Sequence, residues 1–313
     1  MKSEIVQAAE ILSSGGLVAF PTETVYGLGA DASSEKAISR LYSVKRRPPD
    51  HPVIVHFSSA EDAFAWAREV PAAAKKLAER YWPGPLTLIL KRSERAKDFV
   101  TGGQDTVGLR VPSHPVAQAL LSLFGSGIAA PSANRFGLVS PTTAAHVRED
   151  LGNDVDLVIE GGPSEVGIES TILDLSGAEP VLLRPGHVSR KEIEATIGAT
   201  IAEKSASSAR HPGGLERHYA PRTPARMVPS YGLDKAITEL KARVAVLAFS
   251  RPDERVDYWL RMPREPRAYA QRLYAALREL DTAGCGRILI EAPPDSPEWT
   301  AVRDRLKRAC DQG

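Results

Sequence analysis

Apolar positions along the first part of the chain fall into two patterns, stripes at helical spacing and short continuous runs. The stretches 3–14 and 34–45 place their apolar residues on one helical face. Short apolar runs at 17–20 and 52–57 instead fit buried strands. Because further strand and helix patterns alternate in the same way, the sequence predicts an α/β domain over residues 1–201.

Polar residues mark the starts of several of these helices. Ser59 with Asp62, and Ser189 with Glu192, have the spacing of a capping box, in which the serine accepts a hydrogen bond from the backbone of the acidic residue. Ser140, directly before a proline, is predicted to cap a further helix. Such a helix start presents free N–H groups and can also hold an anion.

The character of the chain changes between residues 202 and 224. The stretch 205–209 is small and polar like a linker, whereas 212–221 concentrates charged and aromatic residues between prolines and glycines. Beyond it, strand-like runs alternate with helical stripes. This second pattern predicts a small βαβαβ unit with a parallel sheet over residues 225–313.

Composition narrows the class of protein. A chain of 313 residues with 42% apolar and 25% charged residues is expected to form two globular domains. A net charge of +1 argues against attachment to nucleic acid by bulk charge, although it leaves a local basic patch open. Two cysteines, Cys285 and Cys310, without a Cys-x-x-Cys pair, favour reduced thiols over a zinc site or a disulfide. We see no signal peptide and no long apolar span, so we expect a cytoplasmic protein outside the membrane.

Three cations, Lys45-Arg46-Arg47, end the second predicted helix just before Pro48-Pro49. Cations at a helix C-terminus are commonly explained by the helix dipole alone, which is worth about 0.3–1 kcal/mol. The proline pair fixes the exit of the chain, however, and a lysine with an arginine suits a polyphosphate. Both interpretations stay open from this segment by itself, and Arg46 is expected to point elsewhere.

Other polar segments offer donors to a ligand. Ser132 and Asn134 lie in a loop after a strand, Ser170 follows a short glycine-containing turn, and Arg110 and Arg184 stand at strand ends. Each also has an ordinary structural explanation, because an arginine at a strand end is usually a solvated surface group. The chain has no P-loop, no G-x-G-x-x-G, no H-E-x-x-H and no G-x-S-x-G sequence, so any use of ATP avoids the commonest nucleotide motif.

Taken together, the irregular segments resemble the YrdC-type threonylcarbamoyl-AMP synthases, in their longer branch with an additional C-terminal domain. The resemblance extends over about 185 residues in the family's order. Its segments are Phe20–Leu28, Lys45–Pro48, Trp82–Thr87, Val107–Arg110, Ala130–Asn134, Glu169–Thr171 and Leu183–Gly186, and His218–Pro221 marks the longer branch.

The resemblance implies a fold and a reaction. The expected fold is a twisted, mixed-sheet domain with a positively lined concave face, followed by a lid over residues 202–224 and a Rossmann-like domain over residues 225–313. The expected enzyme is a nucleotidyltransferase that converts L-threonine, bicarbonate (or carbon dioxide) and ATP to threonylcarbamoyl-AMP and pyrophosphate. Mg²⁺ would be carried by the ATP oxygens, and separate proteins would transfer the threonylcarbamoyl group to tRNA.

The resemblance also implies roles for particular residues. Lys45 and Arg47 would neutralise the triphosphate as the central catalytic groups. The residues expected to hold L-threonine are Thr24, His56, Arg110 (taking the carboxylate in a fork), Ala130 through its backbone, and Ser170. The residues expected to contact the nucleotide are His51, Thr106, Ser132, Asn134, Ser140 and Arg184, with His218 and Tyr219 closing over it from the linker.

Two departures from the family pattern affect these expectations. His51 stands where many relatives carry Asn, and its charge would vary near neutral pH. The linker stretch 212–217 lacks the usual Met-Lys-Tyr run, which affects the details of the lid.

Two other functions remain alternatives. A YrdC-like fold can serve as an RNA-binding module, although the near-neutral charge weighs against it. A carbamoyltransferase of the hydrogenase-maturation type uses a related domain, but such chains are expected to carry zinc-binding cysteine pairs and more domains.

Overall fold

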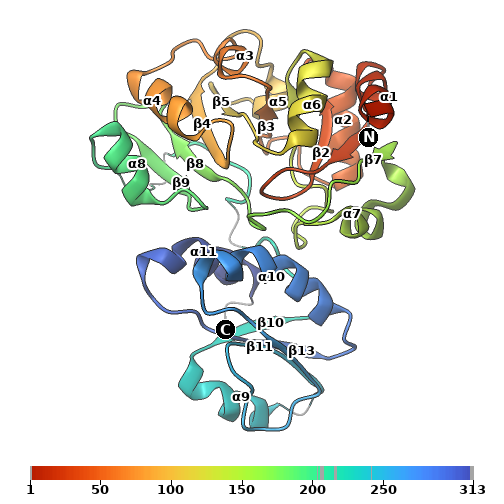
Figure 1. Ribbon diagram of the computed structural model, residues 1–313, viewed down its shortest axis with the longest axis vertical. Helices are drawn as coiled ribbons and strands as arrows, with labels where there is room; N and C mark the ends of the chain where they lie inside the picture. Colours follow the sequence, from red (N-terminus) through yellow and green to blue (C-terminus); the bar gives the residue numbers. More distant parts are fainter. Residues whose placement is uncertain (1, 203, 205–207, 215–216, 241, 311–313) are drawn as a thin grey trace. The chain divides into compact units, whose positions relative to one another are not determined.

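The computed structural model describes residues 2–202, 204, 208–214, 217–240 and 242–310. The chain forms two compact units (Figure 1). The first unit contains Met1–Phe136, Pro141–Glu165 and Glu169–Gly214, and the second contains Gly137–Ser140, Val166–Ile168 and Leu215–Gly313. Two short loops from the middle of the sequence are therefore part of the second unit.

The first unit is built on a nine-stranded sheet with the order β7-β1-β2-β6-β3-β5-β4-β8-β9. Its strands are β1 (Val18–Phe20), β2 (Gly27–Asp31), β3 (Ile54–His56), β4 (Leu86–Lys91), β5 (Thr106–Arg110), β6 (Ile128–Ala129), β7 (Leu157–Val158), β8 (Thr171–Asp174) and β9 (Val181–Arg184). Neighbouring strands pair both in parallel, as β3 with β5 and β4 with β8, and antiparallel, as β4 with β5. The predicted mixed α/β sheet is thus confirmed.

Helices interrupt these strands along the chain. They are α1 (Lys2–Ser13), α2 (Glu35–Lys45), α3 (Ala60–Phe64), α4 (Ala72–Tyr81), α5 (Asp98–Thr101), α6 (Pro115–Phe124), α7 (Ala144–Leu151), the 3₁₀ turn η1 (Gly152–Asp154) and α8 (Arg190–Ile197). The helices α1 and α6 lie side by side, as do α4 and α8 (Figure 1).

Alternation along the strands sends side chains to the two faces of the sheet. On β1, Ala19 joins the large core with residues of α2, α4 and α8, whereas Val18 and Phe20 join a second core with α1 and α6. Both faces of this end of the sheet are therefore buried under helices, as the continuous apolar run at 17–20 predicts. The other end of the sheet is covered differently.

On the face opposite the large core, side chains from strands β3, β4, β8 and β9 form a small apolar cluster. It consists of Ile54, Ile89, Ile172 and Leu183, with Val181 and Ala209 packed against it. Among the described residues, no helical side chain belongs to this cluster. Because side chains alternate with a period of two, His56, Thr87 and Arg110 turn to the same face as the cluster. This part of the sheet face is called the open face below.

The capping predictions have mixed outcomes. Ser189 and Glu192 form a complete capping box at the start of α8, and the Ser59 side chain accepts from the Asp62 N–H. The prediction for Ser140 is wrong, because α7 begins at Ala144 and is capped by Thr143, which accepts from the His146 N–H. Ser140 instead lies fully buried in an irregular segment.

The second unit carries a four-stranded, fully parallel sheet with the order β10-β13-β11-β12. Its elements are β10 (Ala225–Val228), η2 (Ser230–Gly232), α9 (Leu233–Glu239), β11 (Val244–Ala248), β12 (Tyr258–Arg261), α10 (Pro266–Asp281), β13 (Arg287–Glu291), η3 (Pro297–Trp299) and α11 (Thr300–Ala309). The predicted parallel sheet is confirmed, but its fourth strand, β12, was not predicted. Of the four β12 side chains only Leu260 is buried, so no apolar run marks the strand.

No helix in the described part of the chain is long and apolar enough to cross a membrane.

Candidate functional site

Buried polar side chains meet on the open face, where β3 and β5 end side by side. The parallel register places His56 opposite Arg110. Burial, and after it the Arg110 cation, lowers the pKa of His56 to about 3, so the ring is neutral at neutral pH. Its Nδ1 atom has no hydrogen-bond partner among the described residues. A buried nitrogen of this kind is able to form a hydrogen bond with a ligand.

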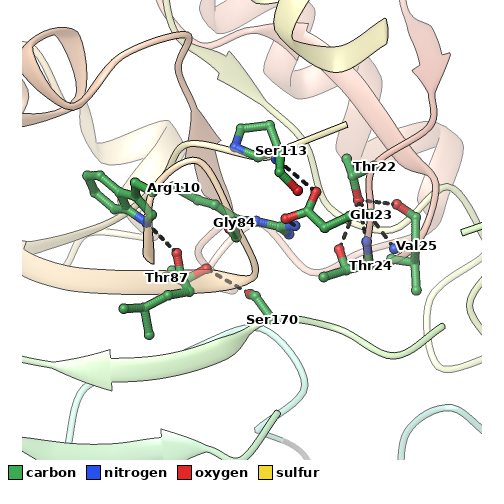
Figure 2. Close-up of polar contacts among 12 residues, drawn as sticks. Thr22, Glu23, Thr24, Val25, Gly84, Thr87, Arg110, Ser113 and Ser170 are labelled. Carbon is green, nitrogen blue, oxygen red and sulfur yellow. Dashed lines mark hydrogen bonds and ion pairs between the residues drawn. The ribbon is translucent and has the colours of Figure 1, made fainter. Parts of the chain in front are cut away.

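Two irregular segments that are distant in the sequence converge on Arg110, and the segment that follows Arg110 completes the cluster. From the β1–β2 connection, Glu23 accepts from Arg110 Nη2 through Oε1 at 2.7 Å (Figure 2). From the tight turn before β4, the Gly84 carbonyl accepts from Arg110 Nε at 3.3 Å. From the segment after β5, the Ser113 N–H donates to the second Glu23 oxygen at 3.1 Å. The ordinary explanation of a strand-end arginine as a solvated surface group does not apply to Arg110, because only 5% of its side chain is exposed.

Thr24 lies beside this cluster and is fully buried. Its hydroxyl is 2.8 Å from the Thr22 hydroxyl, which donates to the Val25 carbonyl at 2.6 Å (Figure 2). Thr22 also accepts from the backbone N–H groups of Thr24 and Val25. Thr22 thus closes a local turn that fixes where the Thr24 side chain stands.

Ser170 and Arg184 form a second polar group on the adjoining strands. The Ser170 hydroxyl lies 2.8 Å from that of Thr87 on β4 (Figure 2). Arg184 donates to the Ser170 carbonyl through Nε at 3.0 Å and to its hydroxyl through Nη2 at 3.1 Å. A residue expected at the amino acid and one expected at the nucleotide are therefore in direct contact. Arg184 is buried, so the surface alternative fails for it as well.

Lys45 ends α2 inside the protein, with 1% of the residue exposed. Its ammonium donates to the carbonyls of Ser132 and Asn134, each at 2.5 Å. Burial, followed by repulsion from Arg47, lowers the pKa of Lys45 well below its ordinary value. Lys45 is therefore buried among carbonyls and is not a solvated charge at the helix end. Arg46, by contrast, is exposed and terminates the helix in the left-handed conformation, as expected for the bystander.

Arg47 lies buried at the chain exit that the prolines fix. Its Nη2 donates to the Pro52 carbonyl at 2.7 Å, and its guanidinium lies over the Phe136 ring at 5.3 Å from the centroid. The His51 ring meets the same Phe136 ring edge-on at 5.4 Å. Burial, and then Arg47, lowers the pKa of His51, so this histidine is more neutral than an exposed one at pH 7. The charge variation expected for His51 is correspondingly shifted to lower pH.

The remaining predicted residues are spread over the loop after β6 and over β5. The Ala130 N–H donates to the Ile54 carbonyl at 3.0 Å, which ties this loop to β3. The Asn134 amide donates to the Arg135 carbonyl, and Asn134 is buried. Thr106 is half-buried on β5. Ser140 belongs to the second unit.

The predicted linker divides between the two units. In the first unit, Ala209 packs against the apolar cluster of the open face, and the Arg210 N–H donates to the Gln104 side chain at 2.7 Å. Arg184 donates to the Pro212 carbonyl at 3.1 Å. This part of the linker thus lies on the open face beside Ser170. Residues 203, 205–207 and 215–216 lie outside the described residues.

In the second unit, His218 and Tyr219 are buried against α10 and α11. The Tyr219 ring stacks on Tyr274 at 5.8 Å, and the Arg305 guanidinium lies over it at 5.4 Å. The His218 N–H donates to the Arg308 carbonyl at 3.1 Å. Both residues are therefore packed into the second unit.

Sequence reasoning missed Thr22, Glu23 and Thr87 as members of this site. Glu23 lies within one of the segments that carry the family resemblance. An acidic residue in a loop with so few other charges was the available signal. Its partner could not be identified, because Arg110 is 87 positions away.

Comparison with known proteins identifies the family. A family described as "Telomere recombination", Sua5-YciO-YrdC, matches residues 10–186, and the "Threonylcarbamoyl-AMP synthase, C-terminal domain" family matches residues 188–310. The threonylcarbamoyl-AMP synthase of Pyrococcus abyssi is 42% identical over 96% of this chain and 92% of its own length. The Bacillus subtilis protein of the same name is 39% identical over 98% and 93%.

The chain belongs to the two-domain threonylcarbamoyl-AMP synthase family. The expected enzyme class, a nucleotidyltransferase, is thereby confirmed. The fold agrees too: the crystal structure of Pyrococcus abyssi Sua5 complexed with L-threonine superimposes with a TM-score of 0.93 at 40% identity. That match covers 99% of this chain and 94% of the relative.

Proposed function

We propose that this enzyme converts L-threonine, bicarbonate and ATP to threonylcarbamoyl-AMP and pyrophosphate. The observation that carries the proposal is the Arg110 cluster on the open face. It combines a buried guanidinium, a neutral His56 with a vacant Nδ1 and the buried Thr24 hydroxyl. A small amino acid with a carboxylate and a hydroxyl suits these groups. The L-threonine complex of the Pyrococcus abyssi relative supports this choice of ligand.

In this proposal, the substrate carboxylate binds Arg110, and His56, Thr24, Ser170 and the Ala130 backbone contact the rest of the amino acid. His56 is neutral, so it can accept or donate a hydrogen bond without adding a second cation beside Arg110. These side chains are buried, so the proposed site would limit access of water to the carbamate, which decomposes readily in water.

The nucleotide part of the site would use Lys45 and Arg47 for the phosphates. Both are buried cations that donate to backbone carbonyls, and phosphate oxygens are stronger acceptors that can replace these carbonyls. The other groups proposed to contact ATP are His51, Thr106, Ser132, Asn134, Ser140, Arg184, His218 and Tyr219.

Mg²⁺ would enter with ATP. Within the described residues, no group of three or more His, Cys, Asp or Glu side chains is placed to hold a metal. The donors at Lys45 and Arg47 are cationic, which fits phosphate oxygens and not a metal held directly by the chain. When bound, the ion would neutralise charge on the triphosphate.

The proposed chemistry has two steps. The threonine ammonium and bicarbonate combine to a carbamate, with loss of one water and one proton. A carbamate oxygen then attacks the α-phosphorus of ATP, the bond from that phosphorus to the bridging oxygen breaks, and pyrophosphate leaves. No covalent enzyme intermediate is needed, because positioning and charge stabilisation supply the rate in such transfers. The product would feed the threonylcarbamoylation of tRNA by separate proteins.

The test is pyrophosphate release from ATP in the presence of Mg²⁺, with L-threonine and bicarbonate omitted in turn. We expect release only when both are present, and a threonylcarbamoyl-AMP product by mass spectrometry. Release that does not depend on threonine, or no release at all, would contradict the proposal.

A further inference from the structure

The buried pair of Glu23 and Arg110 assigns a role to a residue outside the predicted site. We propose that Glu23 is a positioning residue for amino-acid recognition, which holds Arg110 with one free edge and reserves that edge for a carboxylate instead of a phosphate. The inference rests on the proposed function and deepens it, because it concerns how the same site selects its amino-acid substrate.

Both partners are deeply buried, with 5% of the Arg110 side chain and 4% of the Glu23 side chain exposed. A buried charge without a partner is strongly unfavourable, so each requires the other. Both Glu23 oxygens are engaged, Oε1 by Arg110 and Oε2 by the Ser113 N–H. The carboxylate is thus fixed from two sides and cannot follow the arginine elsewhere (Figure 2).

The Nε nitrogen, on the same edge of the guanidinium as Nη2, is held by the backbone. Arg110 Nε donates to the Gly84 carbonyl, and the Gly84 N–H donates to the Val111 carbonyl. A Cβ atom at Gly84 would stand 2.4 Å from the Tyr81 carbonyl oxygen, so the turn admits only glycine here. Nε and Nη2 are therefore engaged, whereas Nη1 has no acceptor among the described residues.

A carboxylate that joins Arg110 in this arrangement binds at Nη1, with Nη2 shared at most. The side-on edge with Nε and Nη2 is already occupied, so the fork that the family resemblance implies can form only end-on, through Nη1 and the second hydrogen of Nη2. Glu23 therefore restricts the substrate to an end-on approach. It also keeps the arginine in its binding position when no substrate is present, so little reorganisation is needed on binding.

Glu23 has a second effect, on charge. The site must keep the strongly anionic triphosphate and pyrophosphate on the Lys45 side and the singly charged amino acid at Arg110. With Glu23 beside it, Arg110 forms a pair with no net charge, which attracts a multiply charged anion less than a lone guanidinium would. A carboxylate is still held by a hydrogen bond at Nη1, whereas a polyphosphate gains little electrostatic attraction from a pair with no net charge.

The experiment compares Glu23→Gln with Asp156→Asn. Asp156 is a matched control in the same unit, because it also joins an arginine, Arg40, to a backbone N–H, that of Leu17. For Glu23→Gln we expect the threonine KM to rise about tenfold or more, as for a lost charged hydrogen bond, while the ATP KM changes less than about twofold. Pyrophosphate should become a competitive inhibitor against threonine. Asp156→Asn should leave both KM values and the inhibition pattern unchanged.

A second variant guards against a folding failure. Glu23→Asp keeps the charge on a shorter side chain, so the threonine KM should rise while pyrophosphate gains no competition with threonine. An unchanged threonine KM in both Glu23 variants, or equal effects on threonine and ATP, would overturn the inference. Threonine-induced thermal stabilisation, measured without turnover, separates this result from failure of the proposed function. An inactive wild-type enzyme refutes the reaction, whereas active Glu23 variants with ordinary threonine binding refute the role of Glu23.

Discussion

The Lys45 ammonium donates a hydrogen bond of 2.5 Å to the backbone carbonyl of Ser132, and so joins the end of α2 to the loop after β6. Nothing in the local sequence of either segment requires this contact. The loop is held to the Lys45 side chain at two points, because the Asn134 carbonyl accepts from the same ammonium. Displacing these carbonyls by phosphate oxygens would connect nucleotide binding directly to the loop.

Lys45→Met is expected to impair ATP use. The change removes the cation and leaves two carbonyls without their donor, at a cost of about 1–3 kcal/mol in the free energy of unfolding. We expect the ATP KM to rise about tenfold or more in pyrophosphate-release assays. Lys36→Met on the exposed face of the same helix is the control and should behave as wild type. Unchanged ATP kinetics in Lys45→Met would remove Lys45 from the phosphate site.

Ser170 and Arg184 are expected to act together in the two substrate sites. Because Arg184 donates twice to Ser170, either change disturbs both partners. Arg184→Met should raise the KM values of ATP and threonine together, by about three- to tenfold each. A double-mutant cycle that combines Arg184→Met with Ser170→Ala should give an interaction energy of about 1 kcal/mol from the kinetic constants. Strictly additive kinetic effects would show that the two residues work independently.

His56 is expected to make stability depend on pH. Its pKa is about 3 in the folded protein and near 6.5 as the ordinary value, so between these values the unfolded chain binds the additional proton. Above about pH 6.5 His56 is neutral in both states and does not lower the free energy of unfolding. As the pH falls from 6.5 toward 3, the unfolded chain is favoured, and the free energy of unfolding decreases by on the order of 2–3 kcal/mol between pH 7 and pH 4.5.

Urea denaturation of wild type and His56→Gln at pH 7 and pH 4.5 measures this contribution. The glutamine variant, whatever its stability at pH 7, should lose less stability on acidification than the wild type does. Carboxylates titrate in both proteins, so the difference between the two slopes isolates the histidine. Parallel slopes would mean that His56 titrates normally.

Tyr219 is expected to stabilise the second unit through its ring. Tyr219→Ala removes a side chain packed on Tyr274 and beneath Arg305, and should cost about 3 kcal/mol in the free energy of unfolding. Tyr219→Phe keeps the ring and should retain most of this stability. Activity that falls in Tyr219→Phe without a loss of stability would support a direct contact with nucleotide. Activity that falls only in parallel with unfolding would indicate a structural role.

Local patterns in the sequence predicted much of the secondary structure. The apolar spacing in α2 and the Ser189–Glu192 capping box depend on residues within a few positions, so their physical causes can be read from the chain. Strand β12 was missed because a single buried side chain leaves no periodic pattern. Ser140 was misassigned because Thr143, three residues later, offers an equally good cap and the tertiary structure selects it.

The sequence by itself determined the fold class, the parallel second sheet and the family, because periodicity, caps and irregular segments are written in neighbouring residues. Tertiary structure alone decided that Glu23 meets Arg110 and that Lys45 meets the carbonyls after β6. Those contacts join positions 87 to 89 apart in the chain, and they depend on the strand order and register of the sheet. Burial then gives these charges their strength, because removal of water makes each partner indispensable to the other.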